Sequence, residues 1–208
     1  MRSEGGIEGQ EIPNGITRFS PEARKAIEES SWPILTLTGR SIRDLRQSDI
    51  RIVPEWPDQN YLETLPSRKS EVAIQWRSLE NSFNKPMSQQ QKLVERYSAR
   101  LSEKIPDAEA IIGEAPDYLE LGSLYIQRFG VPLFEYKTTL IPAFPNFLSR
   151  LRYKTHMYTR TATPVNSPRG SFVAVVSYFN EAHRLDGWPK EQDLHICGVT
   201  PLIVPRQG

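Results

Sequence analysis

Residues 153–179, YKTHMYTRTATPVNSPRGSFVAVVSYF, decide the fold class. Two runs in this stretch, Tyr153–Ala162 and Ser171–Phe179, are rich in Thr, Val, Phe and Tyr, which favour strands. The residues between them, Thr163–Gly170, contain two prolines and end in a glycine, which is typical of a loop. The stretch therefore predicts a β-hairpin with a long tip.

The residues after this hairpin predict one more strand. Asp186-Gly187 is a pair typical of turns. Leu194–Val204 is apolar enough to form a third strand, which Gly198 and Pro201 interrupt. Three strands that follow one another along the chain predict an antiparallel meander.

Two core helices are predicted before the hairpin. The first begins after Pro86, has Ser88 as a candidate cap and is expected to end at Pro106. Its expected buried stripe has a four-residue spacing. The stripe consists of Leu93, Tyr97, Leu101 and Ile105. The second helix is predicted over Pro116–Phe129, with Gly130 as its C-cap, and it is apolar on more than one side.

The N-terminal part has the signals of alternating helices and strands. Ser20 before Pro21 predicts a helix start, Ile34–Thr38 predicts a short strand, and Ser41 with Asp44 predicts a capping box. We therefore predict an α+β protein with an N-terminal α/β segment, two core helices and a C-terminal antiparallel meander of about three strands. The expected organisation is a flexible leader over 1–15, an α/β segment over 16–85 and a helical pair plus sheet over 86–208, packed together as one compact unit.

Composition limits the classes of function. The chain has 208 residues, a net charge of +1 and 38% hydrophobic residues, so neither a nucleic acid nor a membrane is indicated by overall charge. No apolar run is long enough to cross a bilayer. The single cysteine excludes an internal disulfide, and no metal or cofactor motif is present. These features predict a soluble cytoplasmic protein with no cofactor.

The most uneven feature is a stretch without acidic residues, from Tyr136 to Asn180. On a strand through it, alternation places basic groups and one aromatic ring on a single face, a pattern that suits single-stranded nucleic acid. The candidate binding residues are Arg150, Arg152, Lys154, His156, Tyr158 and Arg160. The competing interpretation is a solvated face, or one that pairs with the acidic window 101–135. We expect the competing interpretation to hold.

Two other places carry weaker chemical signals. Asp193, His195 and Cys197 alternate on the last predicted strand, and a thiol near an imidazole can act as a nucleophile with its base. A structural role is favoured there, because residues two apart on a strand are widely spaced. In the turn after Thr38, Arg40, Ser41 and Arg43 surround a helix start that could bind an anion.

These observations leave three functional hypotheses. The first is a non-catalytic protein that binds another macromolecule, either a protein or an anionic ligand. The second is a single-stranded nucleic-acid binder that uses the basic face, and the third is an enzyme with a site near His195 and Cys197. Trp-Pro pairs at Trp32, Trp56 and Trp188 predict rigid turns with an anchored ring, and an exposed tryptophan among them could serve a protein interface.

Overall fold

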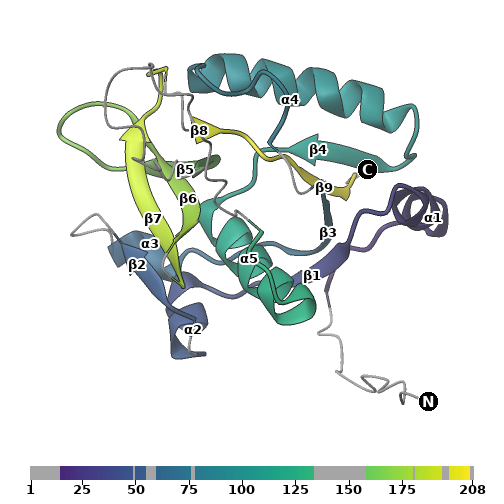
Figure 1. The fold of residues 1–208 in the computed structure, drawn as a ribbon, viewed down its shortest axis with the longest axis horizontal. Coiled ribbons are helices and arrows are strands. Elements are labelled where there is room, and N and C mark those ends of the chain that lie inside the picture. The colour runs from purple at the N-terminus through teal and green to yellow at the C-terminus, as the bar shows by residue number, and fades with distance from the viewer. Residues whose placement is uncertain are drawn as a thin grey trace, which may run out of the picture.

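The computed structural model describes residues 15–48, 50–54, 60–75, 78–133, 158–179, 181–193 and 197–206. The described residues form an α+β fold with antiparallel-rich sheets, as the sequence predicts (Figure 1). Residues 1–14 of the predicted leader lie outside the described residues.

The helices and strands have the following bounds in chain order. They are α1 Pro21–Glu29, β1 Ile34–Thr38, α2 Ile42–Gln47, β2 Ile52–Pro54, α3 Asn60–Thr64, β3 Lys69–Ile74, α4 Met87–Ser102, β4 Ala108–Ile111, α5 Ala115–Phe129, β5 Tyr158–Val165, β6 Phe172–Phe179, β7 Ala182–Pro189, β8 Cys197–Gly198 and β9 Leu202–Pro205. No helix in the described ranges combines the length and the apolar composition that crossing a membrane requires.

The strands form two sheets. One has the order β1-β3-β9-β4 with antiparallel neighbours, and the other has the order β2-β7-β6-β5-β8. In the second sheet β5, β6 and β7 are antiparallel, while β2 and β8 pair in parallel with β7 and β5. Each sheet therefore combines strands from before and after Pro86.

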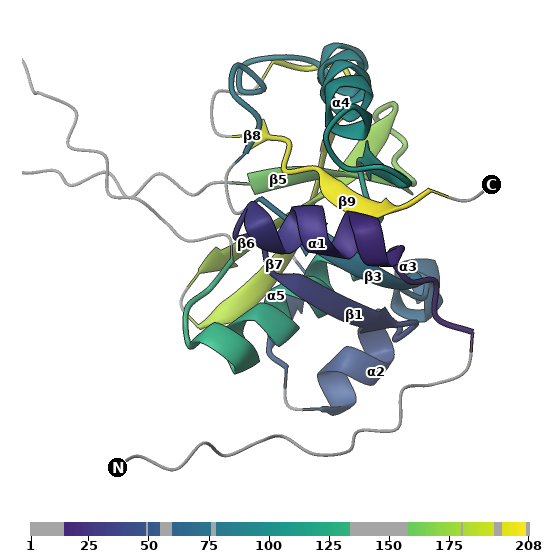
Figure 2. The ribbon, with the colours of Figure 1, turned by 90° about the vertical axis from the view of Figure 1, so that its right-hand side faces the viewer.

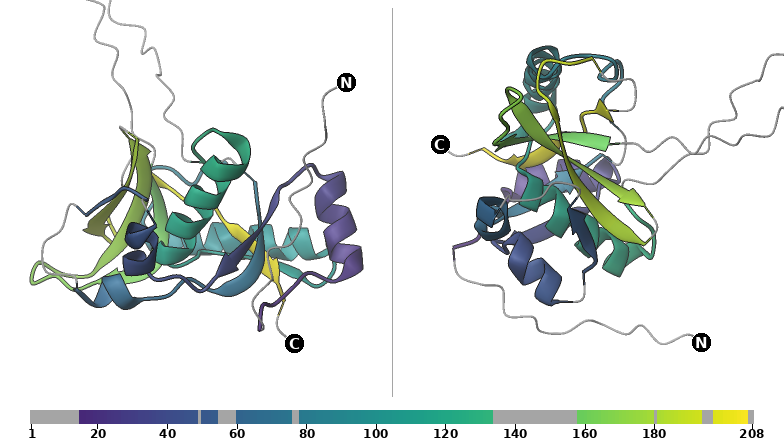
Figure 3. Two further views of the ribbon diagram at one scale, coloured as in Figure 1. Left: turned by 90° about the horizontal axis from the view of Figure 1, so that it is seen from below. Right: turned by 90° about the vertical axis from the view of Figure 1, so that its left-hand side faces the viewer.

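α5 lies between the two sheets, as the left view of Figure 3 shows. It packs with β1, β5, β6 and β7 in one apolar cluster. α1 and α4 pack in a second cluster against the opposite face of the β1-β3-β9-β4 sheet (Figure 2). The first half of α5, Ala115–Ser123, is buried throughout, so the prediction of a core helix is confirmed.

The predicted hairpin forms, but its tip is shorter than predicted, because residues 163–165 belong to β5, and its third strand is not the expected one. Residues 153–157 of the predicted first strand lie outside the described residues. β5 and β6 pair antiparallel, and β7 completes the meander over Ala182–Pro189. The predicted turn Asp186-Gly187 lies within β7, because Gly187 pairs with Ala174 of β6. The predicted strand Leu194–Val204 contributes instead to both sheets, through β8 and β9.

The local helix signals are mostly confirmed. The Ser20 side chain accepts a hydrogen bond from the Ala23 amide, and Ser41 with Asp44 forms the predicted capping box. Gly130 ends α5 with a φ of 71°. In this left-handed region a glycine avoids the steric cost that a Cβ brings.

α4 differs from its prediction in both face and end. It begins after Pro86 without a side-chain cap, since the Ser88 hydroxyl donates to Glu191 instead. Its buried residues are Met87, Gln90, Val94 and Leu101, while Leu93 and Tyr97 are only partly buried. It ends at Ser102, before Pro106, and the Lys104 and Ile105 amides both donate to the Leu101 carbonyl in the turn that follows.

Candidate functional site

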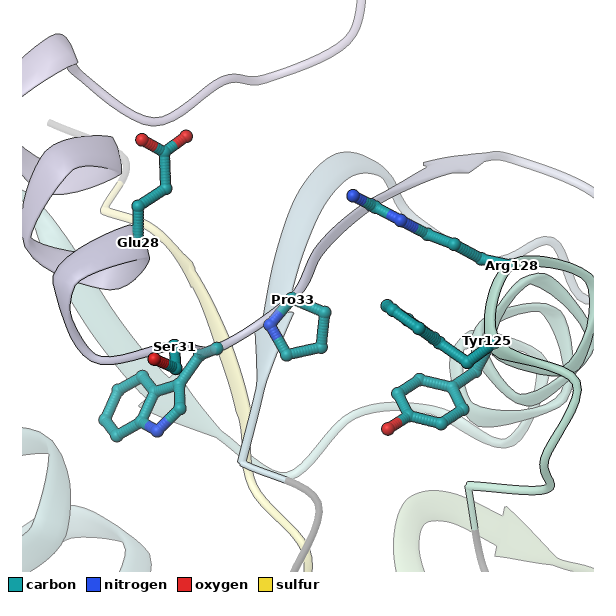
Figure 4. Close-up of a pocket in the computed structure, with 7 residues that line it drawn as sticks. Glu28, Ser31, Pro33, Tyr125 and Arg128 are labelled. Carbon is teal, nitrogen blue, oxygen red and sulfur yellow. The ribbon is translucent and has the colours of Figure 1, made fainter. Parts of the chain in front are cut away.

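The candidate site is a cleft between the end of α1 and the end of α5. The cleft has a volume of about 340 Å³. Its lining residues are Glu28, Ser31, Trp32, Pro33, Tyr125, Arg128 and Phe129. Figure 4 shows Glu28 and Ser31 on the α1 side, Tyr125 and Arg128 on the α5 side, and Pro33 between them.

The α1 wall follows from how that helix ends. The Ser31 amide donates to the Glu28 carbonyl, and the Trp32 amide donates to the Ile27 carbonyl. Ser31 has a φ of 57°, so the chain reverses direction within one residue. β1 then begins directly after Pro33. The turn therefore lies at Ser30 and Ser31 rather than at the predicted Trp-Pro pair, and Trp32 and Pro33 form one side of the cleft.

The α5 wall is formed by its last turn. Tyr125 and Phe129 are four residues apart, and their ring centroids lie 4.6 Å from each other. The Arg128 guanidinium carbon lies 5.3 Å from the Phe129 ring centroid, within range of a cation–π contact. Phe129 is 43% exposed and Val131, just beyond the helix, is 47% exposed.

Buried carboxylates hold α5 in the position that creates this cleft. Asp117 accepts hydrogen bonds from the Arg68 amide, Nε and Nη2 at 2.7, 3.0 and 2.9 Å. Glu120 accepts from the Thr38 amide at 3.1 Å, from the Thr38 hydroxyl at 2.7 Å, and from the Ser67 hydroxyl. These bonds hold α5 against β1 and against the residues just before β3, so two carboxylates of the acidic window have a structural role.

Asp117 and Glu120 each accept several hydrogen bonds, but several polar side chains of the cleft have no hydrogen-bond partner among the described residues. The Glu28 carboxylate, the Ser31 hydroxyl, the Trp32 indole N–H and the Tyr125 hydroxyl make no hydrogen bond or ion pair with any described residue. The neighbouring Glu29 lies 4.0 Å from the Lys25 ammonium group. The cleft thus combines aromatic surface with polar groups that are available to a ligand.

The described part of the predicted basic face is buried rather than open. Tyr158 is 7% exposed, and its ring packs against Trp188 at a centroid distance of 4.7 Å. Arg160 is fully buried, and its guanidinium donates to the Lys190 and Gln192 carbonyls, both at 2.9 Å. The chain after β7 therefore covers this side chain, and the acidic window does not. Arg150, Arg152, Lys154 and His156 lie outside the described residues.

The residues predicted for an enzyme site do not form one in the described ranges. Cys197 is fully buried, and burial raises the pKa of its thiol to about 11, although nearby Arg160 opposes this shift. Asp193 is exposed, and His195 lies outside the described residues. Among the residues that the structure describes, no group of three or more His, Cys, Asp or Glu residues is suited to a metal ion.

The predicted anion site at Arg40, Ser41 and Arg43 is filled by the chain itself. The Asp44 carboxylate accepts from the Ser41 amide at 2.9 Å and from the Ser41 hydroxyl at 2.7 Å. These hydrogen bonds lower the pKa of Asp44. Arg40 donates to the Asp44 carbonyl at 3.0 Å. An internal carboxylate therefore takes the place of an external anion at the start of α2.

A buried Ser–His pair was not predicted from the sequence. The Ser123 hydroxyl donates to the Leu119 carbonyl and lies 3.3 Å from His183 Nε2. Burial lowers the pKa of His183 to about 4, so the ring is neutral at pH 7. Its Nδ1 has no hydrogen-bond partner, whereas a catalytic histidine is oriented by a third group. The pair therefore has a packing role.

Comparisons with protein-family models, curated proteins and solved structures found no match to this chain. The geometry of the cleft is therefore what points to a function. Of its residues, the sequence indicated only Trp32 as a candidate interface residue. The spacing of Tyr125 and Phe129 places them on the same stripe as the buried residues of α5. They differ from those residues only because burial of the helix ends at Ser123, which the sequence does not show.

Proposed function

We propose that this chain is a non-catalytic cytoplasmic protein that works by binding another protein, and that the cleft between α1 and α5 is its binding surface. The observation that carries the proposal is the exposure of Phe129 and Val131. Three large hydrophobic side chains are exposed among the described residues; of these, Phe129 lines the cleft and Val131 follows it two residues further along the chain. Exposed apolar groups gathered at an aromatic cleft are typical of protein interaction sites.

The residue types of the cleft favour binding over catalysis. Trp, Tyr and Arg are the residues enriched at the energetic centres of protein interfaces. Trp32, Tyr125 and Arg128 all line this cleft. Its polar members do not include a nucleophile paired with a base, since no hydrogen bond joins the Ser31 hydroxyl to a described acid or imidazole.

The nucleic-acid alternative gains no support from the described residues. Stacking on Tyr158 and phosphate contacts with Arg160 both need exposed side chains, and these two are buried. The enzyme alternative likewise needs a thiolate, and burial keeps Cys197 protonated at neutral pH. The cytoplasmic part of the proposal is supported by the sequence, whose one cysteine leaves no internal disulfide.

The proposal is tested by selecting peptide ligands from a displayed library and measuring their affinity by calorimetry. A variant with Phe129→Ser and Val131→Ser should bind the selected ligands at least about tenfold more weakly, because these side chains form the apolar part of the surface. Gln127→Ser is the matched control, since Gln127 is exposed on the same helix turn but does not line the cleft. Equal affinity for the double variant and the wild type would overturn the proposal.

A further inference from the structure

We infer that the cleft between α1 and α5 binds a second copy of this chain, so that two chains form a two-fold symmetric dimer. This inference rests on the proposed function, because it names the partner for the same surface. In such a dimer the α1 wall of one chain faces the α5 wall of the other. The cleft suits this arrangement because each of its walls supplies the groups that the opposite wall can bind.

The two charged side chains of the cleft have opposite signs and lie on opposite walls. Glu28 lies on the α1 wall and Arg128 on the α5 wall, with Pro33 between them (Figure 4). Neither side chain forms an ion pair with a described residue. The Arg128 guanidinium keeps its positive charge while it donates to the Ile34 carbonyl. The cleft is therefore neutral as a whole, but it has one negative wall and one positive wall.

A two-fold axis that runs along the cleft, between its walls, pairs these charges. A half-turn about this axis places Glu28 of each chain opposite Arg128 of the other, so two ion pairs form together. Arg128 has guanidinium N–H groups beyond the one that binds Ile34, and a planar guanidinium can hold a carboxylate through two of them. A different partner would need both charges at the same separation, whereas a second copy has them by symmetry.

The same axis also pairs the hydroxyl groups of the cleft. Ser31 lies on the α1 wall and Tyr125 on the α5 wall, and neither hydroxyl has a partner among the described residues. Each hydroxyl can donate and accept, so Ser31 of one chain can bind Tyr125 of the other without a third group. Figure 4 shows Glu28 and Arg128 in its upper half and Ser31 and Tyr125 below them. The charged pairs and the hydroxyl pairs therefore occupy different parts of the interface.

The exposed apolar side chains at the end of α5 contribute the hydrophobic part of the interface. Phe129 is 43% exposed and Val131 is 47% exposed. After the half-turn, the wall that carries Phe129 faces Trp32 and Pro33 of the other chain. Burial of these side chains supplies a stabilisation that ion pairs exposed to water lack. Because the cleft is small, we expect a weak dimer that exchanges with the monomer.

Sedimentation equilibrium of the full chain tests the inference. The wild type should dimerise as its concentration rises from about ten to about five hundred micromolar, the range expected for a weak interface. Glu28→Arg should weaken the dimer at least about tenfold, because guanidinium groups then face each other across the interface. Glu29→Arg is the matched control, since it changes the net charge equally at a residue that lies beside Lys25 and does not line the cleft. This control should leave the dimer unchanged.

A mixture of two variants tests whether Glu28 and Arg128 meet across the interface. Arg128→Glu alone should also be monomeric, because carboxylates then face each other. In an equimolar mixture with Glu28→Arg, the two positive side chains of one chain face the two negative side chains of the other, so a mixed dimer should form. Arg128→Glu also loses the bond to the Ile34 carbonyl, and urea denaturation of each variant checks that it is folded. A mixture of folded variants that stays monomeric would overturn the inference.

The outcomes separate this inference from the proposed function. If the wild type stays monomeric, but ligands selected by display still need Phe129 and Val131, the partner is wrong and the binding surface stands. If the selected ligands do not need these side chains either, the surface itself is wrong. A dimer that Glu28→Arg leaves unchanged forms through another surface, which overturns the inference and leaves the proposed function to the display experiment.

Discussion

Arg128 Nη1 donates a hydrogen bond to the backbone carbonyl of Ile34, at a distance of 2.9 Å. Arg128 lies in the last turn of α5, and Ile34 is the first residue of β1. This single bond therefore joins the two walls of the cleft. A cation near the C-terminus of a helix is also favoured by the helix dipole, so the same side chain stabilises the end of α5.

Replacing Arg128 by leucine should open the cleft without unfolding the protein. The expected loss of unfolding free energy is about 1 kcal/mol, because an exposed hydrogen bond contributes little to stability. The affinity for cleft ligands should fall more clearly, since the last turn of α5 loses its bond to β1, while Glu120 still holds the earlier part of the helix to Thr38. Calorimetry and urea denaturation measure the two effects. Lys92→Leu, an exposed change on α4, should alter neither, and unchanged ligand affinity in Arg128→Leu would show that the bond does not shape the cleft.

Replacing Gly122 by alanine should destabilise the packing between α5 and β7. A Cβ at this position would lie 2.6 Å from His183 Cε1, which is too close for two carbon atoms. Overpacking of this kind costs about 1–3 kcal/mol, measured by urea denaturation. At Gly130, where no atom lies within 4 Å of an added Cβ, alanine should cost about 1 kcal/mol from its left-handed φ alone. Adding His183→Ala to Gly122→Ala should remove most of the clash. If the two losses of unfolding free energy were simply additive, the clash with His183 would not be the cause.

The local parts of the fold could be predicted from the sequence because their causes are local. The Ser20 cap, the capping box of Ser41 with Asp44 and the Gly130 terminus all depend on residues within one helix turn. β7 was missed for the opposite reason. Asp186-Gly187 has the local signal of a turn, but pairing with β6 keeps it extended. The sequence does not indicate which strand will lie beside it.

The candidate site was less predictable than the fold. Trp32 and Tyr125 are far apart in the sequence and meet only because α5 packs against β1. The buried state of Arg160 depends on the chain that follows β7, whose carbonyl groups bind its guanidinium. Alternation along β5 predicts that Tyr158 and Arg160 share one face. It contains no information on whether the chain after β7 covers that face.

The free energy of unfolding should decrease as the pH is lowered, because of His183. Burial lowers its pKa from 6.5 to about 4 in the folded state, whereas the unfolded chain keeps the ordinary value. Below pH 6.5 the unfolded state therefore binds a proton that the folded state does not, and stability is lost as the pH falls towards 4. The loss from this group is about 3 kcal/mol over that window. Urea denaturation at pH 7 and pH 5 should show a steeper loss in the wild type than in His183→Asn. An equal loss of stability in the two proteins would mean that protonation of the His183 ring does not destabilise the folded state.

Cys197 should react very slowly with thiol reagents in the native protein. The thiolate is the reactive form, and a pKa of about 11 leaves only about a thousandth of the thiol ionised at pH 8. The side chain is also fully buried, so reagent reaches it only when the chain opens. Labelling with a chromogenic disulfide at pH 8 should be slow in buffer and fast in urea.

The labelling experiment also tests the hypothesis that Cys197 is a catalytic nucleophile. A variant at Arg160 shows what limits the labelling rate. Arg160→Met removes the nearby cation that favours the thiolate, so it should raise the pKa of Cys197 further. The substitution also removes the bonds to the Lys190 and Gln192 carbonyls, which should loosen the cover over this sheet face. If opening limits labelling, Arg160→Met will react faster than the wild type despite its higher pKa. If ionisation limits labelling, the variant will react more slowly. Fast stoichiometric labelling of the wild type at pH 7 would contradict both the buried position and the raised pKa, and would return Cys197 to the candidates for a nucleophile.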